Sequence, residues 1–192
     1  MGKYRIAREE ERIFMFLDLK SSTVIAEEMG HRRYFEFMSE FIADATIPIM
    51  KNHGEVYQYV GDEIVICWKT EKGNFDPHCI KCFFDIKERI KHNSAKYIKR
   101  YGKVPTFKAG MHFGEVMVGE VGVIKRDLIM SGDAVNTTAH IQSKCNDYDA
   151  ELLMSTVLVD KLSTTIYQVN PLGAVWLKGK RSPIELNSVH IA

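Results

Sequence analysis

The stretch from Val56 to Trp68 constrains the fold of this 192-residue chain more than any other. β-Branched and aromatic residues lie on both sides of one Gly61-Asp62 pair, a pattern typical of two strands joined by a tight hairpin turn. The turn presents the carboxylate of Asp62, and a second acid, Glu63, follows it. A carboxylate on rigid surface backbone is well placed to bind a metal ion and poorly suited to a hydrophobic core.

A second aspartate follows an apolar run near the beginning of the chain. Residues 13–19 read as a strand that is buried on both faces, and Asp18 lies at its end. An unpaired carboxylate next to an apolar strand would destabilise the fold, so we expect Asp18 to have a charged or metal partner. Asp62 alone would pass for an ordinary turn residue, but the pair predicts that Asp18 and Asp62 meet in space and bind a divalent metal.

Ser21, Ser22 and Thr23 separate this strand from a helix that is predicted to begin near Val24. They are good candidates for the helix N-cap. Small hydroxyl residues at a strand-to-helix turn also present backbone N–H groups to an anion. The sequence therefore predicts an anion-binding turn beside Asp18.

The rest of the chain alternates helical periodicity with short strands. Further helices are predicted at 31–51, from 77 to near Gly102, at 134–145 and at 155–162. Strands are predicted at 107–113, at 115–121 as its hairpin partner, at 127–131, at 152–154 and in a C-terminal hairpin about Gly179-Lys180, with a loop at 70–76. This order is typical of an α+β domain with helices on one face of a mostly antiparallel sheet.

Composition limits the classes of function. Hydrophobic residues make up 45% of the chain, charged residues make up 27%, and the net charge is +1, so no basic excess points to nucleic acid. No apolar run is long enough to span a membrane, and no secretory signal is expected. The four cysteines are sparse and irregular, which favours a reduced, cytoplasmic location. We expect residues 1–11 to be a charged tail or linker and residues 12–192 to form one domain.

Five motifs carry a family resemblance across roughly residues 12–190. In chain order they lie at 16–23, 59–63, 110–122, 131–136 and 177–180. Together they resemble the ordered motifs of class III nucleotide cyclase catalytic domains. The resemblance implies a ferredoxin-like α+β domain that works as a head-to-tail homodimer, with its active sites at the dimer interface and an upstream regulatory or sensor domain as a possible partner.

The resemblance also assigns roles to individual residues. Asp18, Asp62 and the backbone of Leu19 would bind two Mg²⁺ or Mn²⁺ ions, and Asn136 would orient the ribose. The remaining implied contacts to a nucleoside triphosphate are those of Ser21, Ser22, Thr23 and Lys178 or Lys180 with the phosphates, and those of Gln58 and Ile129 with the base. Gly61 is a further implied substrate-binding residue. The implied reaction is attack of the 3′-hydroxyl on its own α-phosphorus, with loss of pyrophosphate.

Three positions depart from the family pattern. Four residues after Asn136, the family usually has an arginine that stabilises charge at phosphorus, and here His140 takes its place. A histidine does this only when protonated, and its usual pKa of about 6.5 makes protonation partial at neutral pH. Gln58 and Ile129 match neither the adenine-reading nor the guanine-reading pair of the family. Ile129 offers no polar atom, which favours ATP, and a guanylate or pyrimidine nucleotide cyclase is the alternative.

Three hypotheses of function follow. The first is an active homodimeric cyclase. The second is a catalytically weakened cyclase-like module that acts by dimerisation or nucleotide binding. The third is an unrelated metal-dependent phosphotransfer domain, such as a polymerase-palm-like diguanylate cyclase. Residues 60–63 match part of the hairpin motif of such a domain.

The histidine position yields the first prediction. His140→Arg should raise the rate of cyclic product formation from ATP and Mn²⁺ by up to about 100-fold, because a permanently charged guanidinium replaces an imidazole that lacks the guanidinium fork. The measurement is initial-rate product analysis of parent and variant side by side. A variant no faster than its parent would show that position 140 does not stabilise charge at phosphorus.

Overall fold

The computed structural model describes residues 4–70, 77–162 and 164–191. Its strands are β1 Arg8–Leu19, β2 Glu55–Val60, β3 Glu63–Lys69, β4 Phe107–Val121, β5 Asp127–Ser131, β6 Leu152–Ser155, β7 Tyr167–Val175 and β8 Ile184–Ile191. Its helices are α1 Ser22–Met29, α2 His31–Lys51, α3 His78–His92, α4 Ser94–Tyr101, α5 Asp133–Ser143 and α6 Thr156–Val159. Within these ranges no helix combines the length and the apolar character needed to cross a membrane. Most of the loop predicted at 70–76 lies outside the described residues.

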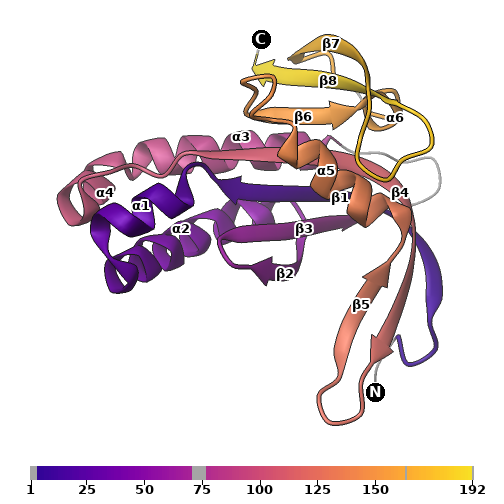
Figure 1. Cartoon of the computed structure of the whole chain (residues 1–192), viewed down its shortest axis with the longest axis horizontal. Helices are drawn as coiled ribbons and strands as arrows, with labels where there is room; N and C mark the ends of the chain where they lie inside the picture. The colour runs from indigo at the N-terminus through magenta and orange to yellow at the C-terminus, as the bar shows by residue number, and fades with distance from the viewer. Residues whose placement is uncertain (1–3, 71–76, 163, 192) are drawn as a thin grey trace.

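One sheet in the order β2-β3-β1-β4-β6-β8-β7 organises the domain, and β5 pairs with β4 beside this path (Figure 1). Every pairing is antiparallel except the parallel one between β4 and β6. Strand β1 lies between β3 and β4, and its side chains alternate between two buried layers. This confirms the predicted α+β class, the mostly antiparallel sheet and the hairpin about Gly61-Asp62.

Helices cover both faces of the sheet, whereas the sequence predicted helices on one face only. Met15 and Leu17 of β1 pack into the same cluster as residues of α2 and α3. Phe14 and Phe16 point to the opposite face, where they share a second cluster with Ala134 of α5. The prediction was wrong because α5 is short and only weakly amphipathic, so its pattern does not reveal which face of the sheet it covers.

Three boundaries also differ from the prediction. Strand β4 runs unbroken through Gly114, and its hairpin partner is β5, so 115–121 is not a return strand. The helix predicted from 77 to 102 is two helices that meet at Asn93, a residue type that favours helix ends. Strand β1 begins at Arg8, earlier than predicted, because its charged first residues pair along β4.

Two glycines of β4 let helix α5 lie unusually close to the sheet. A Cβ atom on Gly110 would come within 2.3 Å of the backbone nitrogen of Gln142, and a Cβ on Gly114 would come within 2.8 Å of the Cβ of Ala134. Any larger side chain at these two positions would push α5 away from β4. Both glycines therefore serve a packing contact between β4 and α5.

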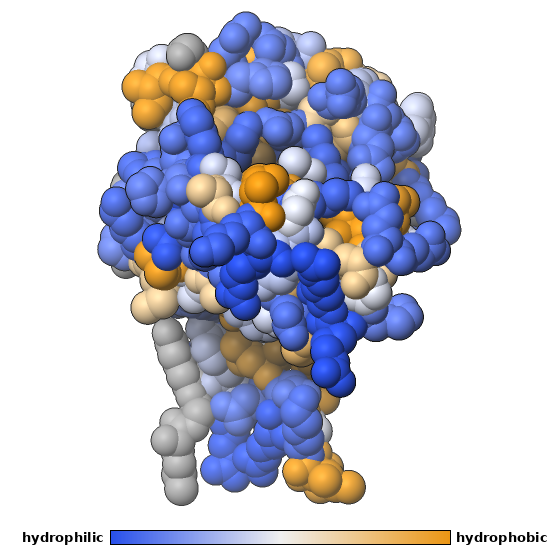
Figure 2. All heavy atoms as spheres, turned by 90° about the vertical axis from the view of Figure 1, so that its left-hand side faces the viewer, coloured by the Kyte–Doolittle hydropathy of each residue, from blue (hydrophilic) through white to orange (hydrophobic). Residues whose placement is uncertain are grey.

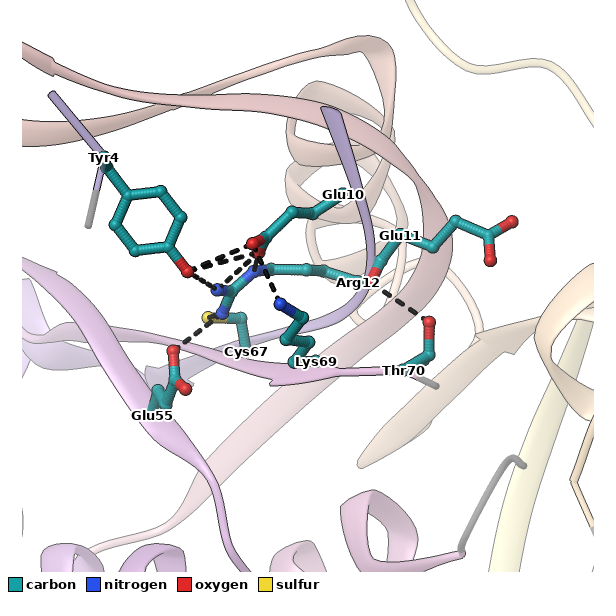
Figure 3. Close-up of polar contacts among 8 residues, drawn as sticks. All are labelled: Tyr4, Glu10, Glu11, Arg12, Glu55, Cys67, Lys69 and Thr70. Carbon is teal, nitrogen blue, oxygen red and sulfur yellow. Dashed lines mark hydrogen bonds and ion pairs between the residues drawn. The ribbon is translucent and has the colours of Figure 1, made fainter. Parts of the chain in front are cut away.

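Arg12 is the centre of a buried polar cluster at the far end of β1 (Figure 3). Its guanidinium is 1% exposed and donates to Glu10 at 2.8 Å and to Glu55 at 2.7 Å, and to the hydroxyl of Tyr4 at 3.2 Å. Burial alone would lower the pKa of Arg12, but Glu55, Cys67 and Glu10 raise it above its ordinary value. A buried charge with these partners ties β1 to the start of β2 and to the segment before β1.

The contact between α5 and β4 yields the second prediction. Gly110→Ala should lower the free energy of unfolding by at least about 2 kcal/mol, because the new methyl group meets helix backbone that cannot rotate away. Chemical denaturation of parent and variant measures this. Gly102→Ala, at an exposed helix end with φ +74 and open space around it, is the control and should cost only about 1 kcal/mol. A Gly110→Ala protein as stable as its parent would contradict the close approach.

Candidate functional site

Asp18 and Asp62 lie together, as the sequence predicted. Asp18 is next to last in β1, and Asp62 lies in the turn between β2 and β3. Because Leu17 pairs with Ile64 near the start of β3, the end of β1 lies beside this turn. Burial raises the pKa of Asp18, and the charge of Asp62 raises it further. The two carboxylates are thus near neighbours where strand β1 ends beside the turn between β2 and β3.

Two residues that the sequence did not single out surround Asp18. Lys108, its cross-strand partner on β4, places Nζ 3.8 Å from Asp18 Oδ2. Gln142 of α5 donates from Nε2 to the same oxygen at 3.0 Å. Both oppose the rise in the pKa of Asp18. No sequence signal marks them, because one lies in an alternating strand and the other is a lone polar residue on a helix.

Glu63 and Tyr34 complete the acidic environment. Burial raises the pKa of Glu63 to about 7, and the charges of Asp18 and Asp62 add to the rise, whereas Lys108 opposes it. Burial also raises the pKa of Tyr34, which lies against Asp62 and Ser22. Acidic groups gathered this closely destabilise one another unless a proton or a cation intervenes.

The residues at this site fit a hard divalent cation. Asp62 Oδ2 is buried and has no hydrogen-bond partner among the residues that the structure describes, which is costly for a carboxylate oxygen that binds nothing. Among the described residues, no group of three or more His, Cys, Asp or Glu side chains is arranged to hold a metal. Mg²⁺ commonly takes one or two carboxylates together with substrate phosphates, so Asp18 and Asp62 have the donor atoms that such a site requires.

The turn after β1 differs in detail from the predicted anion-binding turn. Ser21 is the N-cap residue of α1, but it adopts a left-handed conformation (φ 59) and its side chain makes no capping bond. The backbone N–H of Lys20 is already bonded to the carbonyl of Thr106 at 2.8 Å. Ser21 and Thr23 are exposed and Ser22 is half-buried, so N–H groups for an anion would come from these three residues rather than from Lys20.

Asn136 and His140 lie together on α5 but turn away from the aspartates of their own chain. One helical turn separates them, so they share a face of the helix. Asn136 is exposed and His140 is half-buried. His140 and Gln142 point to roughly opposite sides, because two residues are about 200° of helical turn, and Gln142 is the one that reaches Asp18.

The two lysines of the C-terminal hairpin also differ in their surroundings. Lys180 forms an ion pair with Asp133 at the start of α5, so this structure places its ammonium beside α5. The Lys178 side chain is exposed. The structure thus brings Lys180 to the helix of Asn136 and His140 rather than to the pair of aspartates.

Gln58 lies on β2 and Ile129 lies on β5, and these two strands do not pair with each other in the described sheet. Both are exposed, with 40% of Ile129 accessible. The residues next to them are joined directly, because the backbone N–H of Met130 donates to the hydroxyl of Tyr57 at 2.9 Å. This bond ties β5 to β2 beside the two predicted base-reading positions.

Comparison with known proteins identifies the family. The model of the adenylate and guanylate cyclase catalytic domain matches residues 5–189, and the chain therefore belongs to this family. The match decides against a polymerase-palm-like diguanylate cyclase.

Individual relatives agree with this assignment. Adenylate cyclase 2 from Rhizobium meliloti (strain 1021) is 34% identical over 189 residues, which are 98% of this chain and 52% of that protein. The chain thus spans about half the length of this relative. The crystal structure of the adenylyl cyclase CyaB from P. aeruginosa matches with a TM-score of 0.85 at 15% identity, over 97% of this chain and 96% of that one. The guanylate cyclase domain of RhGC from Catenaria anguillulae, solved with GTP, matches with a TM-score of 0.80 at 16% identity, over 96% and 98%. These two structures support the fold.

The crowded carboxylates yield the third prediction. The pKa of Glu63 is raised to about 7 from 4.5, so its folded state holds the proton more tightly and stability is lost as pH rises through this window. Glu63→Gln should therefore become progressively more stable than its parent from about pH 4.5 to about pH 7, and keep that advantage above it.

Urea denaturation at several pH values, in buffer with a metal chelator, measures this difference. Glu88→Gln, which changes a glutamate that is 66% exposed on α3, is the matched control and should follow the parent. Equal pH dependence in the Glu63→Gln variant and its parent would show that Glu63 is not buried beside Asp18 and Asp62.

Proposed function

We propose that this chain is a nucleotide cyclase that converts a nucleoside triphosphate, with ATP favoured, into the 3′,5′-cyclic monophosphate and pyrophosphate. One observation carries the proposal beyond family membership. The carboxylates of Asp18 and Asp62 meet at the end of strand β1, where an oxygen of Asp62 is buried without a hydrogen-bond partner among the described residues. Such an arrangement is poor for stability and well suited to a site that binds metal and triphosphate.

In the proposed site Asp18, Asp62 and the backbone carbonyl of Leu19 would hold two Mg²⁺ or Mn²⁺ ions. When bound, these ions supply charge neutralisation and activate the 3′-hydroxyl and the leaving pyrophosphate. Backbone N–H groups of Ser21, Ser22 and Thr23 bind the outer phosphates at the start of α1. The bond from O3′ to the α-phosphorus forms while the bond to pyrophosphate breaks, and the hydroxyl proton passes to solvent.

We further propose that two copies of the chain build each site. Asn136 and His140 face away from the aspartates of their own chain, so they serve the aspartates of a second copy. There Asn136 hydrogen-bonds the ribose, and protonated His140 stabilises charge on the α-phosphate. Lys178 and Lys180, carried by the hairpin next to α5, add positive charge near the phosphates once Lys180 leaves Asp133.

An exposed apolar arm supports the homodimer. Strands β4 and β5 project from the body of the domain (Figure 1), and Figure 2 shows hydrophobic atoms at the tip of the projection below a largely hydrophilic face. The exposed apolar residues of this arm are Met117, Val121, Val123, Ile124, Leu128 and Ile129. Apolar side chains gathered on one projecting element are typical of a protein contact surface, and a second copy would bury them.

The choice of base rests on Gln58 and Ile129. Gln58 both donates and accepts hydrogen bonds, so it can read the edge of adenine. Ile129 offers no polar atom, which favours a base without an exocyclic oxygen at that point. The name of the relative from R. meliloti supports ATP as well, and GTP or a pyrimidine triphosphate is the alternative.

His140 favours a second candidate function. Without an arginine at that position, the domain could act as a weakened module that binds nucleotide or dimerises with little turnover.

Because the relative from R. meliloti is about twice as long, an upstream regulatory or sensor domain is a proposed partner. We also propose a cytoplasmic location, which agrees with the sparse and irregular spacing of the four cysteines in the sequence.

The metal site yields the fourth prediction. Asp62→Ala should lower cyclic product formation by at least about 100-fold, because one of the two metal carboxylates is lost. Its melting temperature should not fall, because the change removes a charge that repels Asp18 and Glu63. The assay offers each of the four nucleoside triphosphates with Mn²⁺ and follows cyclic product and thermal unfolding in parallel.

Asp160→Ala is the matched control, since it removes an exposed aspartate at the end of α6 and should leave turnover unchanged. Retained turnover in the Asp62→Ala protein would remove this carboxylate from the site. A parent that binds nucleotide and forms no cyclic product from any triphosphate would select the weakened module.

A further inference from the structure

We propose that Gln142 is a positioning residue for Asp18, and that its side-chain amide holds the metal-binding carboxylate in place from within the same chain. The inference rests on the proposed function of Asp18 as a metal ligand. It concerns a residue on the buried side of α5, opposite the side that carries His140.

The position of Asp18 explains why a polar side chain is buried at position 142. Gln142 is only 6% exposed, and a buried side-chain amide without a partner would be costly. Its Nε2 donates to Asp18 Oδ2 at 3.0 Å, across 124 positions of sequence. A carboxylate has about four lone-pair sites, so this bond fixes the orientation of Asp18 and leaves capacity for a cation.

The backbone around Gln142 is held as firmly as its side chain. Gly110 has no side chain, so the backbone of Gln142 can lie very close to it. A Cβ atom on Gly110 would be only 2.3 Å from the backbone nitrogen of Gln142. Next to this contact the strand pairing of β4 with β1 places Lys108 opposite Asp18. Gln142 therefore approaches Asp18 from a rigid helix that is seated on the neighbouring strand.

Lys108 does not replace Gln142 in this role. Its Nζ is 3.8 Å from Asp18 Oδ2, longer than a good hydrogen bond, and it donates instead to Asn146 Oδ1 at 3.0 Å. Lys108 contributes charge at a distance, whereas Gln142 supplies the direct hydrogen bond. Residues that orient a metal ligand in this way typically affect metal affinity by about 10–100-fold when they are removed.

Binding of Mn²⁺ in the presence of a non-cyclisable ATP analogue tests the inference without relying on turnover. Gln142→Met keeps the length and apolar stem of the side chain and removes the donor, and Gln142→Leu is a second donor-free variant in case the first unfolds. The loss of the electron paramagnetic resonance signal of free Mn²⁺ reports binding. We expect the dissociation constant for Mn²⁺ to rise by about tenfold or more.

Thr138→Val is the matched control on the same helix. Thr138 is fully buried and donates only to the carbonyl of Ala134, at 2.7 Å, so its loss perturbs α5 without touching Asp18. Mn²⁺ affinity should be unchanged in this variant. Unchanged affinity in the folded Gln142 variants, or equal losses in Thr138→Val, would overturn the inference while leaving the proposed function standing. A parent that binds no Mn²⁺ would overturn both.

A mixed dimer separates positioning of Asp18 from any effect on Asn136 and His140. One copy carries Asp62→Ala, so only the site built on the aspartates of the other copy can work. Gln142→Met should raise the Mn²⁺ requirement when it is placed in the copy with intact aspartates, and should have little effect in the Asp62→Ala copy. The opposite pattern would show that Gln142 acts on the far side of α5 and would contradict the inference.

Discussion

Helix α5 lies against strand β4 at a distance that only glycine permits, and the candidate site depends on this contact. Gly110 and Gly114 leave room for the helix backbone. The helix then brings Gln142 to Asp18 on one side and presents Asn136 and His140 on the other. A single packing contact thus positions Gln142 beside Asp18, which we propose binds metal, and the side chains that we propose reach a second copy.

Much of the fold follows from the sequence because its signals are local. The apolar run at the end of β1 and the hairpin about Gly61-Asp62 each lie within one short stretch of sequence. The pattern of apolar residues in each stretch therefore predicts strands directly. The continuous strand β4 and the placement of α5 could not be predicted in the same way. Gly114 looks like a turn residue until its partner Ala134, far along the chain, explains why it has no side chain.

Some residues of the candidate site can be recognised from local sequence, and others cannot. Asp18 and Asp62 stand out because carboxylates are unusual at the ends of apolar strands. Gln142 and Lys108 do not, because each is an ordinary polar residue whose importance comes from the partner it meets in space. Lys180 shows the reverse case. The sequence predicts a phosphate contact, whereas the structure pairs it with Asp133, so its proposed role requires this ion pair to open.

The central claim is that Asp18 and Asp62 of one copy and Asn136 and His140 of another form one metal-dependent nucleotide site. A crystal structure with Mn²⁺ and 3′-deoxy-ATP, which lacks the attacking hydroxyl, tests it directly through the anomalous signal of manganese. The account predicts manganese against both aspartates of one copy, with Asn136 and His140 of a second copy at the ribose and the α-phosphate. Manganese bound elsewhere, or all four side chains supplied by one copy, would contradict it.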